Sequence, residues 1–392
     1  MLNDVFRVPN SEHVSSASNA HTPSPSGFLQ TSKQILRTPR LNQDNADTLR
    51  QQIRDYFLNT FETYESLFEC LDGDEAFYKK PISLRHPLIF YFGHTATFFI
   101  NKLLLVHLIE ERLNPRFEAL FAVGVDEMSW DDLNDQHYDW PTPHEVKSYR
   151  DQVKQTVLHI IDTAPLTPPI NWNHPWWAIL MGIEHERIHL ETSSVLIRQH
   201  DLEYVRAHPA WKASDFSTTA PENTWIDVAS GQVKLGINQA HPFYGWDNEF
   251  GQHEAQVEAF QASKYLVSNQ EFLAFVDAGG YSSLDYWEQE GQGWLSFSEA
   301  KYPTFWVKQH QTWYLRLMTE IVPMRWDWPV EVNYHEAKAF CNWKKQQTGQ
   351  NIRLPTEDEW YRIYDISGLN EIDHQRADGN IHLDYGASSC PV

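Results

Sequence analysis

The sequence predicts two tandem structural units, an N-terminal four-helix bundle and a C-terminal α+β domain. From about residue 45 to Arg198, apolar residues recur at helical spacing. Beyond His208 the pattern changes to short β-like runs interrupted by glycine, with helical stretches near 268–278 and 333–348. The predicted boundaries are 1–35 for a disordered, Ser- and Pro-rich tail, 36–205 for the bundle, 206–222 for a linker and 223–392 for the second domain.

Four long helices are expected in the first unit, over 45–71, 87–112, 143–164 and 174–201. The third follows the Pro-Thr-Pro segment at 141–143, and the fourth has Asn173 as a candidate N-cap. Four antiparallel helices form a bundle, and bundles build metal sites from side chains on facing helices.

The composition argues against several function classes. The 392 residues have a formal net charge of −22 with no basic cluster, so we expect no binding to nucleic acid. The most apolar stretch, 87–109, is interrupted by His94 and Lys102, which predicts a buried core helix and no membrane span. Three widely spaced cysteines, and no secretory signal in the first 27 residues, predict a cytoplasmic protein.

The most informative segment is HERIH at 185–189. A helix turns by about 100° per residue, so His185 and His189 project about 40° apart and can bind one metal ion. They interrupt a stripe of apolar and small residues that is typical of a bundle core, where two buried imidazoles are costly without a ligand. Glu191 is about 120° or more from both histidines, so we assign it, with Arg187, to a solvated or interdomain face.

His94 is the candidate third ligand. It lies in the second expected helix and shares one stripe of that helix with Phe90 and Phe98. A histidine in such a stripe can instead be a core residue that is hydrogen-bonded to a neighbour. That alternative stays open for His94 and for the pair in HERIH.

A zinc protease is the rival interpretation of HERIH, because H-E-x-x-H is also the zinc-protease helix, with Glu186 as the general base. The extended protease motif needs Gly and His where this chain has Thr192 and Val195, and no glutamate follows about 20 residues beyond His189. We therefore disfavour a protease. A zinc-dependent hydrolase or a thiol-handling zinc enzyme on the bundle stays an alternative.

Five motifs occur together in this chain: GHTA at 93–96, GVDEMSWDD at 124–132, HERIHLE at 185–191, WPVEVNYHEA at 328–337 and RLPTEDEW at 353–360. This set resembles the sulfoxide synthases of thiohistidine biosynthesis, a family with an ovothiol and an ergothioneine branch. The resemblance covers about residues 36 to 392. It implies a DinB-like bundle followed by a formylglycine-generating-enzyme-like domain, which is related to C-type lectins.

The resemblance also implies a cofactor and a reaction. The cofactor is non-haem iron(II) held by His94, His185 and His189, and the reaction is the O2-dependent joining of the sulfur of cysteine to the imidazole of histidine as a sulfoxide. Histidine is the acceptor in the ovothiol branch, which we expect here. An ergothioneine-type enzyme that uses trimethylhistidine stays an alternative, and so does a non-catalytic metal-binding or recognition module.

The family implies a longer second domain than this chain contains. Related sequences continue beyond Val392 with a segment that completes the domain and includes a catalytic tyrosine, so no catalytic residue is assigned here. We expect the chain to bind iron but to turn over poorly alone, with a separate chain as a candidate source of the missing portion. Arg85 is the candidate for binding a substrate carboxylate, with a solvated helix-entry residue as the alternative.

Overall fold

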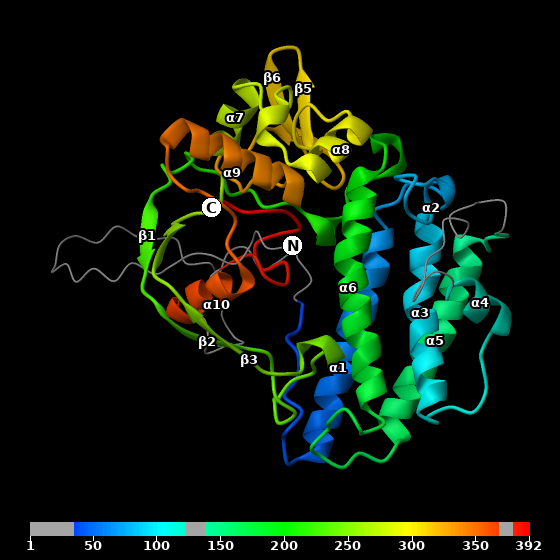
Figure 1. The fold of residues 1–392 in the computed structure, drawn as a ribbon. Coiled ribbons are helices and arrows are strands. Elements are labelled where there is room, and N and C mark those ends of the chain that lie inside the picture. Colours follow the sequence, from blue (N-terminus) through cyan, green and yellow to red (C-terminus); the bar gives the residue numbers. More distant parts are fainter. Residues whose placement is uncertain (1–34, 123–137, 368–378) are drawn as a thin grey trace, which may run out of the picture.

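The computed structural model describes residues 35–122, 138–367 and 379–392, and it contains a helical bundle beside a mixed α+β domain (Figure 1). The predicted fold class is therefore confirmed. The tail expected over 1–35, except its last residue, and the motif at 124–132 lie outside the described ranges.

Four long helices form the bundle, as predicted. They are α1 (Ala46–Phe68), α3 (Leu88–Leu105), α5 (Pro143–Thr163) and α6 (Trp177–Gln199), with the short helices α2 (Glu75–Tyr78) and α4 (Pro115–Leu120) on their connections. Each long helix packs against two others, since α3 and α1 each contact both α5 and α6. Local sequence fixes the helix starts: Asn45 caps α1, and Thr142 forms a capping box with Glu145 in α5.

Three predicted helix ends differ from the structure by three residues or more, and the first is that of α1, which ends at Phe68 instead of residue 71. The α6 helix begins at Trp177, because residues before it form tight turns in which His174 accepts a hydrogen bond from the Trp176 amide at 3.2 Å and Asn173 donates to the Asn171 side chain. Asn173 is therefore not its N-cap. The α3 helix stops at Leu105 instead of residue 112, because the chain leaves helical geometry at His107, whose φ is +55°.

The apolar helix α3 is long and hydrophobic enough to cross a membrane by length and composition alone. In this fold, however, 72% of that segment is buried inside the protein. Its apolar side chains, among them Phe99, Ile100 and Leu103, are fully buried in the bundle core. The core-helix prediction for this stretch is thus confirmed by its packing.

The second domain combines short antiparallel strands with helices. Its strands are β1 (Trp225–Val228) paired with β4 (Phe260–Ser263), β2 (Gly231–Leu235) paired with β3 (His253–Val257), and the three-stranded sheet β5 (Trp306–Gln309), β6 (Thr312–Arg316) and β7 (Ile321–Pro323). Its helices are α7 (Asn269–Asp277), α8 (Gln289–Ser298), α9 (Tyr334–Thr348) and α10 (Glu357–Ile366). An aromatic core, which includes Phe272, Phe275 and Trp328, joins α7, α9 and the sheet β5–β7.

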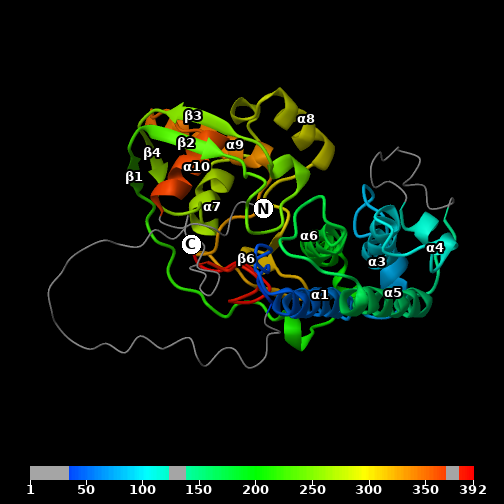
Figure 2. The same ribbon diagram turned by 90° about the horizontal axis from the view of Figure 1, so that it is seen from below.

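Helix α6 lies between α3 and the second domain (Figure 2). At its first turn Trp177 packs on Tyr244, with ring centroids 4.7 Å apart. At its last turn Arg198 forms a 2.6 Å ion pair with Glu331 of the second domain. Arg187, which we had assigned to a solvated face, is largely buried against α1, where its guanidinium donates to Thr60 at 2.9 Å. The sequence pattern missed this burial because a packing partner outside the helix covers that face.

Candidate metal centre

Three imidazoles from two facing helices converge in the bundle. His94 extends from α3, and His185 and His189 extend from consecutive turns of α6. One potential ligand nitrogen from each ring lies within 4.8 Å of the other two. The ring centroids are 4.5 to 5.0 Å apart. Three ligand nitrogens this close together could hold one shared metal ion.

Two glycines allow the close approach of the helices that hold these histidines. A Cβ at position 182 of α6 would lie 2.3 Å from the Phe99 ring of α3, far inside ordinary contact. A Cβ at position 93, beside His94, would lie 2.5 Å from the ring of Phe121. Any larger residue would push α3 away from α6 or from the segment after α4. The separation of the ligands therefore depends on the absence of a Cβ atom at Gly93 and at Gly182.

Aromatic rings surround the three histidines. Phe98 stacks on His185 with centroids 3.7 Å apart and planes 7° apart, and Phe90 stacks on His94 at 5.2 Å. Burial in this wall lowers the pKa of His94, lowers the pKa of His185 well below its ordinary value, and lowers the pKa of His189 to about 3. Near neutral pH all three rings are therefore uncharged, which is the form that binds a metal.

The hydrogen bonds of the rings also suit ligation. His94 Nδ1 lies 2.7 Å from the carbonyl oxygen of Phe121, so Nδ1–H donates there and Nε2 keeps its lone pair for a ligand. The Nδ1 atoms of His185 and His189 are buried, and neither has a hydrogen-bond partner within the described ranges. Burying a ring nitrogen without a hydrogen-bond partner or a metal costs free energy. The set of three neutral nitrogens, with no carboxylate among them, fits a divalent transition metal.

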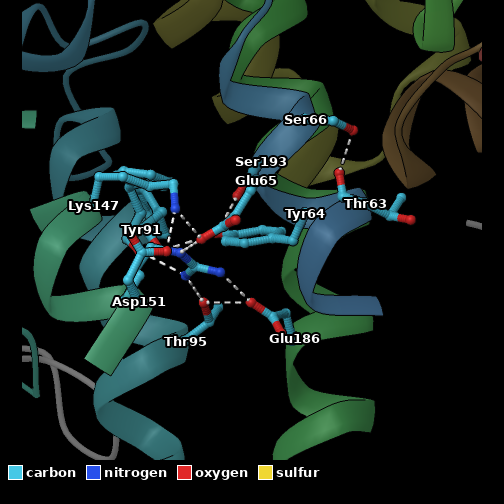
Figure 3. Close-up of polar contacts among 12 residues, drawn as sticks. Thr63, Tyr64, Glu65, Ser66, Tyr91, Thr95, Lys147, Asp151, Glu186 and Ser193 are labelled. Carbon is cyan, nitrogen blue, oxygen red and sulfur yellow. Dashed lines mark hydrogen bonds and ion pairs between the residues drawn. The ribbon is translucent and has the colours of Figure 1, made fainter. Parts of the chain in front are cut away.

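Glu186 and Thr95, which follow His185 and His94 in the sequence, meet between α6 and α3 (Figure 3). Glu186 is fully buried, and its carboxylate accepts from Arg150 of α5 at 2.7 Å and from the Thr95 hydroxyl at 3.1 Å. Burial raises the pKa of the Glu186 carboxyl, and the Arg150 guanidinium opposes that rise. Because these contacts hold Glu186 in an ion pair, it is not placed as the general base that a zinc protease would need.

Arg85, the candidate for a substrate carboxylate, is exposed just before α3. The hydrogen bond that places its guanidinium is a 3.3 Å contact with the Leu84 carbonyl. It is close enough to Tyr91 to lower the pKa of that hydroxyl, although burial of Tyr91 raises it more. Tyr91 in turn packs 6.1 Å from the His189 ring. The structure shows no direct contact between Arg85 and the three histidines among the described residues, and its substrate role stays a prediction.

Sequence reasoning missed three contributors to this site. The Phe121 carbonyl could not be foreseen, because a backbone acceptor leaves no sequence signal. Phe98 was in the stripe of His94, but its stacking on the opposite helix was not expected. Arg150 had a detectable signal: it interrupts the apolar core face of α5, between Val146 and Val153.

Comparison with known families and proteins agrees with this architecture. Residues 56–193 match the DinB superfamily, and residues 212–363 match the sulfatase-modifying factor enzyme 1-like domain. The chain is similar to ergothioneine biosynthesis protein 1 of Neurospora crassa, with 24% identity over 78% of this chain and 38% of that protein. It is also similar to the protein of the same name from Schizosaccharomyces pombe, with 23% identity over 72% of this chain and 38% of that protein.

Hercynine oxygenase of Mycolicibacterium smegmatis is a further relative, 27% identical over 56% of this chain and 47% of that protein. The order of the two matched domains and these relatives support placing the chain in the sulfoxide synthase family. The chain spans about 38% of the length of the two ergothioneine biosynthesis proteins that it matches. The boundaries predicted at 35, 205 and 222 stay predictions. The first matched segment lies within 36–205, whereas the second begins at residue 212, inside the predicted linker.

Proposed function

We propose that this chain contains the iron site of an O2-dependent, non-haem sulfoxide synthase, which joins the sulfur of cysteine to the imidazole of histidine. The observation that supports the proposal most directly is the convergence of His94, His185 and His189 within 4.8 Å. The similarity to ergothioneine biosynthesis protein 1 and hercynine oxygenase supports the same reaction type. A cytoplasmic location stays part of the proposal.

The surroundings of the three histidines favour a redox metal over the zinc of a hydrolase. Zinc hydrolases place a carboxylate as general base beside the metal, and here Glu186 is held by Arg150. Bound iron(II) would supply one-electron chemistry and open coordination positions at which two substrates are held side by side. A site with three neutral ligands keeps the full charge of the ion, which favours an incoming thiolate.

The residues of the chain contribute orientation and exclusion of water. The carbonyl of Phe121 fixes the tautomer of His94. Phe98 lies flat on His185 and limits its rotation. The aromatic wall keeps bulk water away from the imidazoles, so an organic substrate ring could stack beside them.

The acceptor substrate separates two versions of this function. Histidine is the acceptor that we propose, and trimethylhistidine is the second candidate, supported by the names of the relatives, which refer to ergothioneine and hercynine. Among the described residues, no contact distinguishes a free α-amine from a trimethylated one. Both acceptors are therefore tested side by side.

Metal analysis tests the site before any turnover is measured. The chain is purified without oxygen, and its iron and zinc are quantified by mass spectrometry. We expect about one iron per chain and an absorption change when cysteine is added. Stoichiometric zinc with hydrolase activity would instead support the zinc-enzyme alternative, and no metal at all would support the recognition module.

Product analysis then tests the reaction. Iron, O2 and cysteine are supplied with histidine or with trimethylhistidine, and the products are identified by mass spectrometry. We expect a histidine–cysteine sulfoxide, with low yield from this chain alone and a higher yield when the C-terminal portion of a longer relative is added. A product from trimethylhistidine alone would assign the ergothioneine branch. Efficient turnover by the isolated chain would contradict the expected dependence on that portion.

A further inference from the structure

One buried arginine connects all four long helices of the bundle. Arg150 extends from α5 and is fully buried. Its Nη2 donates to Glu186 of α6 at 2.7 Å, its Nη1 donates to Thr95 of α3 at 2.8 Å, and its Nε donates to Glu65 of α1 at 3.1 Å. Nη1 also donates to the Phe92 carbonyl of α3 at 2.9 Å. A single planar group thus fixes the other three helices relative to α5.

Two of these contacts are at residues adjacent to the candidate metal ligands. Thr95 follows His94 in α3, and Glu186 follows His185 in α6. The hydroxyl of Thr95 also donates directly to the carboxylate of Glu186 at 3.1 Å (Figure 3). This link therefore sets both the axial position and the rotation of α6 against α3, one residue from the imidazoles that must meet.

The energetics of this network are poor for stability alone. The ion pair of Arg150 and Glu186 is completely removed from water, and burying two charges costs free energy that their attraction repays only with full hydrogen bonding. Glu186 Oε2 is buried without a hydrogen-bond partner among the described residues. Apolar residues of similar size often serve as well for stability, whereas buried ion pairs can fix one register of packed helices.

We propose, given the metal centre proposed above, that Arg150, Glu186 and Thr95 form a positioning device that holds His94 and His185 at the separation a shared metal requires. None of the three is a ligand. They act through the backbone of the adjacent histidines, as hydrogen-bonded groups outside a ligand set commonly do. Replacing these residues should therefore weaken metal binding more than it lowers the free energy of unfolding.

The test uses Co(II), whose visible spectrum reports coordination geometry, on the full chain without other metal. The main variant is Arg150→Met combined with Glu186→Leu, which replaces the ion pair by apolar groups of similar length. We expect Co(II) affinity about 10- to 100-fold weaker and an altered spectrum, with an unchanged helical circular dichroism signal. The matched control is Lys154→Met, which removes an ion pair between α5 and α1.

A second variant with a smaller change tests the proposal if the double variant does not fold. Thr95→Val removes only the hydroxyl, and Thr95→Ser restores it. We expect weaker Co(II) binding in Thr95→Val and recovery in Thr95→Ser. Folded variants with unchanged affinity and spectrum would overturn the positioning role, and so would variants that all fail to fold. If the unmodified chain binds no Co(II), the proposed metal centre itself is wrong, which is a separate outcome.

Discussion

Replacing Gly182 by alanine is expected to separate the metal site from the stability of the fold. A Cβ at this position would lie 2.3 Å from two atoms of the Phe99 ring, whereas ordinary contacts begin at 3.4 Å. Phe99 is fully buried, so it has little room to turn away. The helices α3 and α6 must therefore move apart by roughly 1 Å, the distance by which the new contact is too short.

The two energetic consequences of this change differ in size. Overpacking a core costs about 1–3 kcal/mol, and replacing a helical glycine by alanine returns about 1 kcal/mol. The free energy of unfolding should therefore fall by only about 0–2 kcal/mol. Metal–ligand distances, in contrast, can deviate from their usual values by only about 0.2 Å. We expect Co(II) affinity to fall by about 10- to 100-fold, the range seen when groups that orient metal ligands are lost.

The assay is a Co(II) titration followed by absorbance, with urea unfolding of the metal-free chain measured in parallel. Gly293→Ala is the matched control, because Gly293 is also helical and a Cβ there meets nothing within 4 Å. That variant should gain about 0.5–1 kcal/mol of stability and bind Co(II) normally. If Gly182→Ala binds Co(II) as tightly as the unmodified chain, the contact with Phe99 does not set the ligand separation.

Three further outcomes are expected. His94→Ala should abolish stoichiometric Co(II) binding, whereas His159→Ala, at an exposed position of α5, should leave it unchanged; equal binding by both would show that the site is misassigned. Burial lowers the pKa of His200 in the folded state, so below pH about 6.5 the unfolded chain binds more protons there and stability falls with falling pH. His200→Gln should therefore make the free energy of unfolding depend less on pH between pH 7 and 5. An unchanged slope of that free energy against pH would contradict this. Arg198→Ala removes the 2.6 Å ion pair between α6 and the second domain and should speed proteolytic cleavage within 206–222. Arg54→Ala, which removes an ion pair inside the bundle, should not change the cleavage rate. Equal cleavage rates in the two variants would show that Arg198 does not hold the domains together.

Within the part of the chain that the structure describes, the helical pattern alone was enough to predict the bundle. Apolar positions at helical spacing located four helices to within a few residues at most ends, because each such face must be buried against its neighbours. Two of the ends that differed are near His107 and Trp177, where single-residue backbone geometry and turn hydrogen bonds decided the outcome. Such short-range competition leaves little signal in hydrophobic periodicity.

The sequence by itself determined that His185 and His189 share one helix face, because helical geometry is local and both residues lie within two turns. His94, about 90 residues earlier in the chain, was a candidate partner because it lies on another helix of the expected bundle, and the family resemblance implied the same set of ligands. Only the tertiary structure decided the separation of α3 from α6, where the Phe99 ring packs against Gly182 and the Arg150 guanidinium contacts both helices. Packing distances between helices arise from side chains that are distant in sequence, and no local pattern records them.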